Sequence, residues 1–176
     1  MSESIAVFGG GRYLDSNRLD FLKYQGVLDL EGLYKAMAAW FKERKYDFYE
    51  KLYKDKPPEL ELSWIGERKV NDFYKYTIEL YFHFYDIEKV EVIQNGKKKD
   101  MVKTRVWISF KPVVIVDWQN RWDKTPLTKT LFKLYFNHVI KREVELLHAD
   151  KLWYITYKLH NLVKNYLGME TKGNAY

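Results

Sequence analysis

The chain has 176 residues, 47% of them hydrophobic and 31% charged, so it can form one globular domain with its own core. It contains no cysteine, which excludes disulfides, thiolate metal sites and cysteine nucleophiles. The net charge of +6 permits attraction to nucleic acid, anionic lipid or acidic protein, but it does not require any of them.

Aromatic residues make up 18% of the chain, and Tyr and Trp combine an apolar ring with a polar group that suits interfaces. This surplus favours a protein that makes contacts. No apolar run approaches the length of a membrane span, and the N-terminus lacks the layout of a signal peptide, so we expect a cytoplasmic protein.

Residues 1–28 show no steady hydrophobic period, and we interpret them as an N-terminal arm with a flexible joint at Gly9–Gly11. The arm is too apolar for a solvated tail. It could fold back on its own domain, dock on a neighbouring subunit, or remain disordered, and the first is favoured. A single domain is expected over residues 29–168, followed by a short polar tail over residues 169–176.

A first helix is predicted over residues 30–44, with Asp29 as its N-cap. Its apolar residues recur at intervals of three and four, which indicates one buried stripe. The stripe consists of Leu30, Leu33, Tyr34, Met37, Trp40 and Phe41.

Six strands are predicted next, at residues 46–53, 59–64, 73–85, around 90–92, 101–110 and 113–116. Pro57–Pro58 separates the first two, because proline cannot donate to a sheet ladder. Short connections between successive strands favour an antiparallel meander. We therefore expect an α+β fold in which this sheet packs with one N-terminal and two C-terminal helices.

The strongest signal lies in residues 73–85, where apolar and polar residues alternate, as they do again in residues 101–110. Side chains of a strand point alternately to opposite faces, so each segment has one core face and one solvent face. Asn95–Gly96 indicates a hairpin between the two. A two-residue loop would place Val92 opposite Lys99, so a longer loop or a bulge fits the apolar faces better.

Thr125 and Pro126 predict the start of a helix that runs to about Leu147 and is apolar over a wide arc, as in a helix between two layers. Asp150 can cap a second helix that ends at Gly168, a residue suited to a left-handed stop.

The last helix supplies the leading candidate surface. Its predicted core side comprises Leu152, Ile155, Leu159, Leu162, Val163 and Tyr166, and the opposite side carries Trp153, Tyr157, His160 and Lys164. Large aromatic residues in an exposed row suggest a protein-binding site. Alternatively, another element of the same chain, such as the N-terminal arm, covers them.

The outward face of the sheet supplies an alternative, because cations and aromatic rings on a sheet can bind phosphates and stack bases. Glu79 stands among these residues, and a helix could cover the face. The candidate RNA-binding residues are Lys75, Tyr81, His83, Lys103, Arg105 and Trp107.

An enzyme is the third possibility. His138 could act as a base held by Glu145, but no nucleophile or second acid can be placed beside them, and a structural polar network that includes Arg142 is favoured. No cofactor or metal site is predicted, and a small-molecule ligand is not expected.

The chain contains the segments Glu31–Tyr34, Trp40–Phe41, Glu50–Lys54, Lys69–Val70 and Gln119–Trp122. Together they resemble a group of small uncharacterised archaeal proteins, over about residues 26–168. The resemblance implies a cytoplasmic archaeal setting and no known activity.

The sequence therefore favours a non-enzymatic, basic protein that binds a protein partner or forms homo-oligomers, with an RNA-binding module as the alternative.

Overall fold

The computed structural model describes residues 12–13, 20–94, 97–122 and 124–169. They form an α+β fold with one open antiparallel sheet, whose order is β1–β6–β5–β4–β3, with β2 also paired to β6. The predicted fold class is confirmed at this level. The strands are β1 (Arg12–Tyr13), β2 (Asp20–Leu28), β3 (Asp47–Lys56), β4 (Glu59–Lys69), β5 (Tyr74–Gln94) and β6 (Lys97–Val116).

The predicted alternation in the central strands is confirmed. Along residues 74–84 of β5 and 106–110 of β6, the even-numbered apolar residues face the core, and odd-numbered residues such as His83 and Trp107, which pair with each other, face outward. The buried set is Tyr74, Tyr76, Ile78, Leu80, Phe82, Phe84, Val106, Ile108 and Phe110. The odd-numbered pair Thr77 and Val113 is nevertheless buried.

The number and limits of the strands differ from the prediction. Two pairs of predicted strands are each one long strand, because β5 continues through residues 86–89 and β6 continues through Pro112. Pro112 is tolerated because β2 pairs with β6 only up to Phe110, and β1 pairs only from Val114 onward. The sheet therefore has five long strands and the short β1.

The longer loop or bulge predicted at the hairpin is wrong, because Val92 pairs with Lys99 and Gln94 pairs with Lys97. The register shifts instead between Tyr85 and Glu88, with Asp86 at a φ of 52°. Residues 95–96 themselves lie outside the described part of the chain. The bulge shifts the pairing of the two strands by one residue. Beyond it, odd-numbered residues of β5 pair with even-numbered residues of β6, as Lys89 does with Val102.

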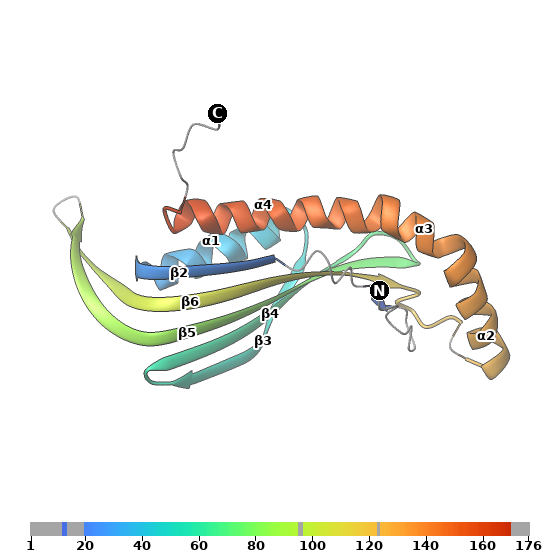
Figure 1. The fold of residues 1–176 in the computed structure, drawn as a ribbon, viewed down its shortest axis with the longest axis horizontal. Helices are drawn as coiled ribbons and strands as arrows, with labels where there is room; N and C mark the ends of the chain where they lie inside the picture. The colour runs from blue at the N-terminus through green and yellow to red at the C-terminus, as the bar shows by residue number, and fades with distance from the viewer. Residues whose placement is uncertain (1–11, 14–19, 95–96, 123, 170–176) are drawn as a thin grey trace, which may run out of the picture.

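Helix α1 (Leu30–Glu43) forms where it was predicted, and the side chain of Asp29 caps it by accepting a hydrogen bond from the Gly32 amide. Helices α1 and α4 (Asp150–Tyr166) lie along one face of the sheet (Figure 1). The Tyr166 hydroxyl joins them by donating a hydrogen bond to Asp29 over 3.1 Å. No helix within the described ranges covers the opposite face of the sheet.

The two predicted C-terminal helices form one continuous, bent run. Helix α2 (Pro126–Tyr135), the π-helical turn η2 (Phe136–Ile140), α3 (Lys141–Glu143) and the π-helical turn η3 (Val144–Ala149) lead directly into α4. Asp150 does not cap a new helix, because Ala149 and Asp150 both have right-handed helical dihedral angles. The bend between α2 and α4 is visible in Figure 1 and falls in the π-helical region.

The first half of this run is exposed on one side, rather than packed between two layers as predicted. Its buried residues are Phe132, Phe136, Ile140, Val144 and Ala149, spaced by four and finally by five. That spacing exceeds 3.6 residues per turn, and π turns accommodate it.

Residues 20–28 of the predicted arm form β2, which pairs with β6 of the same chain. This part of the arm therefore folds back on its own domain. Gly9–Gly11 and residues 170–176 of the predicted tail lie outside the described residues.

Candidate functional site

The outward face of the sheet brings most of the predicted RNA-binding residues together. His83 pairs with Trp107, and Tyr85 pairs with Arg105, so these side chains form two adjacent rows across β5 and β6. The rings of His83 and Tyr85 stack at 3.8 Å, and Tyr81 lies 6.4 Å from His83. The result is a line of rings along one solvent-facing surface.

Strand β2 adds residues to this face that the sequence analysis missed. Phe21 stacks on Trp107 at 5.5 Å, and Lys23 and Gln25 pair with Trp107 and Arg105. A hollow of about 480 Å³ is lined by Lys23, Gln25 and Tyr85 together with Arg105 and Trp107. The alternation of side-chain types in residues 20–28 could have predicted this strand, but the sequence analysis treated residues 1–28 as an arm.

Carboxylates hold most of the cations of this face. Arg105 pairs with Asp86, Lys103 with Glu88 at 3.3 Å, and Lys75 with Glu67 at 2.9 Å. Lys75 is also separated from the rings, near the start of β5. The face therefore offers stacking surface, with much less free positive charge than the sequence suggested.

On the last helix, the structure separates the four predicted partner-binding residues. Tyr157 is exposed, Trp153 and Lys164 are half-buried, and His160 is only 3% exposed. His160 therefore lies in the interior and cannot present itself to a partner in this arrangement. Its ring contacts Phe110 of β6 at 5.2 Å.

The core side of α4 is rotated relative to the predicted one, toward Thr156 and His160. Thr156 can be buried because its hydroxyl donates a hydrogen bond to the Leu152 carbonyl. His160 lies with its Nε2 3.4 Å from an Asp20 carboxylate oxygen. Asp20 belongs to β2, so the N-terminal arm does cover this residue, which was the alternative interpretation.

Burial lowers the pKa of His160 below its ordinary value; the nearby Asp20 carboxylate partly offsets this effect, and Lys164 adds to it. Burial therefore disfavours the charged form of the ring. Burial likewise lowers the pKa of His148, whose Nδ1 lies 3.0 Å from the Tyr76 hydroxyl and whose ring lies 3.9 Å from that of Tyr74.

The C-terminal helical run exposes an apolar surface that matches the prediction only at Tyr157; its residues Leu127, Leu131, Leu134 and Val139 were predicted to lie in a helix packed between two layers. The surface has two parts, on the two arms of the bend. On α2 and η2 it consists of Leu127, Leu131, Leu134, Tyr135 and Val139, which we call the α2 patch. On η3 and α4 it consists of Leu146, Leu147, Tyr154 and Tyr157, which we call the α4 patch.

The structure does not bury the polar network predicted for His138, Arg142 and Glu145. His138 and Arg142 are exposed, and Glu145 lies 3.9 Å from Lys141. Within residues 12–13, 20–94, 97–122 and 124–169, no three His, Asp or Glu side chains are placed to hold a metal ion.

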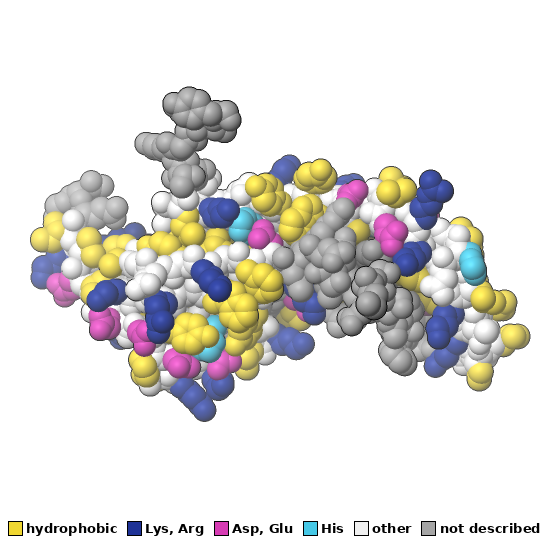
Figure 2. All heavy atoms as spheres, in the orientation of Figure 1, with side chains coloured by type: hydrophobic (Ala, Val, Ile, Leu, Met, Phe, Trp, Pro, Cys, Tyr) yellow, Lys and Arg dark blue, Asp and Glu magenta, His cyan; other side chains and the backbone are white. Residues whose placement is uncertain are grey.

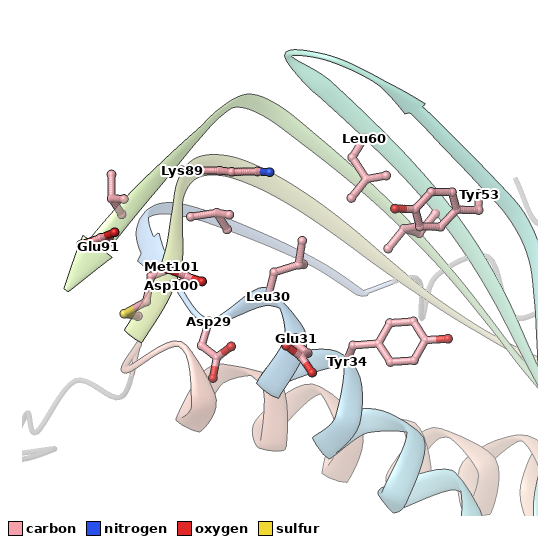
Figure 3. Close-up of a pocket in the computed structure, with 13 residues that line it drawn as sticks. Asp29, Leu30, Glu31, Tyr34, Tyr53, Leu60, Lys89, Glu91, Asp100 and Met101 are labelled. Atoms are coloured by element: carbon pink, nitrogen blue, oxygen red, sulfur yellow. The ribbon is translucent and has the colours of Figure 1, made fainter. Parts of the chain in front are cut away.

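A groove of about 690 Å³ lies between the start of α1 and the far ends of β5 and β6, with Lys89 extending into it (Figure 3). Its wall is largely apolar and includes Leu60 and Met101. Lysines from outside the groove bind carboxylates at its rim: Lys99 binds Asp29 at 2.6 Å, Lys35 binds Glu31 and Lys98 binds Glu91.

Among these carboxylates, Asp29 accepts hydrogen bonds from three groups. Burial acts to raise its pKa, but hydrogen bonds from Lys99, Gly32 and Tyr166 leave the pKa below its ordinary value. This aspartate therefore accepts from three donors that belong to α1, the hairpin and α4, and it joins these elements.

Comparison with protein-family models, with curated proteins and with solved structures gave no significant match.

Proposed function

We propose that this chain is a non-enzymatic interaction protein that self-assembles or binds a protein partner through the α4 patch. The observation that carries the proposal is the exposure of Leu146, Leu147 and Tyr154, at 58%, 62% and 66%. Large apolar side chains gathered on one surface are typical of interaction sites.

The surroundings of the α4 patch support a protein partner. Trp153 lies beside Tyr157, and Glu143, Asp150 and Lys151 supply both signs of charge around the apolar residues. Aromatic residues inside a polar rim of mixed charge are the usual anatomy of a protein interface.

The size of the patch indicates a reversible assembly. Each of its four large side chains is roughly half exposed, so its burial would contribute about 1–2 kcal/mol, or about 4–8 kcal/mol together. Association costs about 4–15 kcal/mol in lost freedom. We therefore expect assembly to depend on protein concentration.

Light scattering over a series of concentrations tests the proposal. The wild-type chain should form an assembly, or co-purify with a stable partner, and Leu147→Glu with Tyr154→Glu should abolish it. Leu131→Glu on the α2 patch is the matched control and should leave it intact. A strict monomer that co-purifies with nothing would contradict the proposal.

A second candidate function is binding of single-stranded RNA by the outward sheet face. The stacked rings of Phe21, Trp107, His83 and Tyr85, on a face that none of the described helices covers, favour it, because bases stack on such rings. Trp107→Ala should weaken binding of a labelled single-stranded RNA by about 1–3 kcal/mol. Arg105→Ala should reduce the salt dependence, and binding that ignored salt would remove this candidate.

A further inference from the structure

The α2 patch differs from the α4 patch in its charges. Residues 124–142 contain Lys124, Lys129, Lys133, Lys141 and Arg142 and no acidic residue, while Asp123 directly precedes them and Lys141 lies 3.9 Å from Glu145. The next segment contains Glu143, Glu145 and Asp150. Helix α2 and η2 therefore carry basic residues and no acidic one, and the other arm of the bent helical run has mixed charge.

The apolar side chains of the basic arm are well exposed. Those of the α2 patch have between 47% and 70% of their surface in solvent. Leu127, Leu131 and Leu134 follow the spacing of four and three that places side chains on one side of a helix. Between Leu127 and Val139 the patch is about 18 Å long.

The opposite side of the same arm is anchored to the protein. Phe132, Phe136 and Ile140 are buried, and the Phe132 ring contacts those of Phe73 and Trp122. The α2 patch therefore points away from the body of the protein, at the end of the molecule where α2 bends out of line with α4 (Figure 1). In Figure 2 this end shows yellow apolar and dark blue basic side chains and no magenta acidic ones.

We propose that the α2 patch docks on the surface of an anionic lipid bilayer. A helix whose apolar side is flanked only by lysine and arginine inserts its apolar side chains about 5–10 Å into the headgroup region. Each basic residue near an anionic surface adds about 1 kcal/mol. Trp122 and Tyr135, which stack on each other, are residue types that favour this depth.

Charge decides between a bilayer and a second copy of this chain. Pairing two α2 patches would bring two basic segments together, which costs free energy, whereas an anionic surface complements them. Docking is peripheral rather than spanning, because no helix among the described residues is long and apolar enough to cross a bilayer. This inference is independent of the proposed use of the α4 patch.

Co-sedimentation of the full chain with lipid vesicles tests the inference. The wild type should sediment with phosphatidylcholine vesicles that contain phosphatidylserine and remain in solution with pure phosphatidylcholine. Binding should fall steeply from about 0.1 M to about 1 M salt, where the Debye length shrinks from about 10 Å to about 3 Å.

Two variants address the two contributions. Leu131→Glu with Leu134→Glu removes the apolar side, and Lys124→Glu with Lys133→Glu reverses the charge. Each pair should weaken binding to anionic vesicles by about tenfold or more. Leu147→Glu with Tyr154→Glu on the α4 patch is the matched control and should bind as the wild type does. All these positions are exposed, so circular dichroism should show unchanged folding.

Three results would overturn the inference. The wild type could fail to sediment with anionic vesicles at low salt. The apolar variant could bind as well as the wild type, which would mean that charge alone is at work. The α2 variants could lose a co-purifying acidic protein while the wild type ignores vesicles, which would identify the occupant as a protein. None of these results bears on the assembly measured through the α4 patch.

Discussion

Gly66 in β4 is predicted to be irreplaceable because the ring of Phe41 rests directly against its backbone. A Cβ atom added at Gly66 would lie 2.3 Å from Cε1 and 2.6 Å from Cδ1 of Phe41. Carbon atoms that are not bonded to each other need about 3.5–4 Å. The Gly66→Ala chain must therefore move either the ring or the strand.

The ring has little room to move. Phe41 is fully buried and contacts Trp40, Tyr46 and Phe48 at centroid distances of 5.2, 5.8 and 5.3 Å. Overpacking of this kind costs about 1–3 kcal/mol. For a chain of this length, such a loss lowers the melting temperature by about 2–10 °C.

Thermal and urea unfolding of Gly66→Ala measure this cost, and Gly26→Ala is the matched control. At Gly26 the added Cβ would meet the Tyr24 hydroxyl at 2.6 Å, which is the end of a flexible side chain that can rotate away. The control should therefore lose much less stability. If Gly66→Ala were as stable as Gly26→Ala, the proposed packing of α1 on the sheet would be refuted.

Three further predictions concern the C-terminal helical run and its supports. Burial lowers the pKa of His160 below that of the unfolded chain, so its neutral form stabilises the fold above pH 6.5 and this contribution is lost as the pH falls below that value. His160→Gln should accordingly flatten the change in urea midpoint between about pH 7.5 and about pH 5, and an unchanged profile would contradict the burial of the ring. Asp117 is 2% exposed and accepts hydrogen bonds from the amides of Arg121 and Trp122, each over 3.0 Å, so Asp117→Ala should cost about 1–3 kcal/mol of unfolding free energy in urea. Asp72 lies 3.4 Å from the exposed Arg121, so Asp72→Ala should cost almost no unfolding free energy. Equal losses of unfolding free energy in the two variants would count against this role of Asp117. Tyr166→Phe removes the hydrogen bond to Asp29 and should cost about 0.5–1.5 kcal/mol in the same assay, whereas Tyr154→Phe should cost nothing, because the Tyr154 side chain is exposed.

The sheet could be predicted because its signal is local. Alternation along residues 74–84 and 102–110 assigns each side chain to a face whatever the partner strand is. The N-cap at Asp29 was likewise readable, since capping needs only the next three residues. The continuity of β5 through the bulge at Asp86 was not readable, because the sequence has a polar break where the strand changes face.

The C-terminal run was predicted less well because a projection at 100° per residue assumes a regular α-helix. From Phe132 to Ala149 the buried residues are spaced by four or five, so a regular projection gradually misplaces the core side. Leu127, Leu131 and Leu134 lie on the regular helix α2 and were misassigned for another reason: a helix that is apolar over a wide arc was expected to pack between two layers, and these residues are exposed. The burial of His160 depends on Asp20 of β2, a contact across 140 residues that no local pattern reports.

The central claim is that the exposed α4 patch is a protein-binding surface. Whether a protein covers this patch in solution can be measured directly. The chain has no cysteine, so Lys151→Cys at the rim of the α4 patch provides a single site for an environment-sensitive fluorophore, and Glu31→Cys on α1 provides an exposed control. As the protein concentration rises, the label at position 151 should shift to a less polar environment while the label at position 31 stays constant. A label at position 151 that stays as solvated as the control at every concentration, with no partner co-purifying, would contradict the claim.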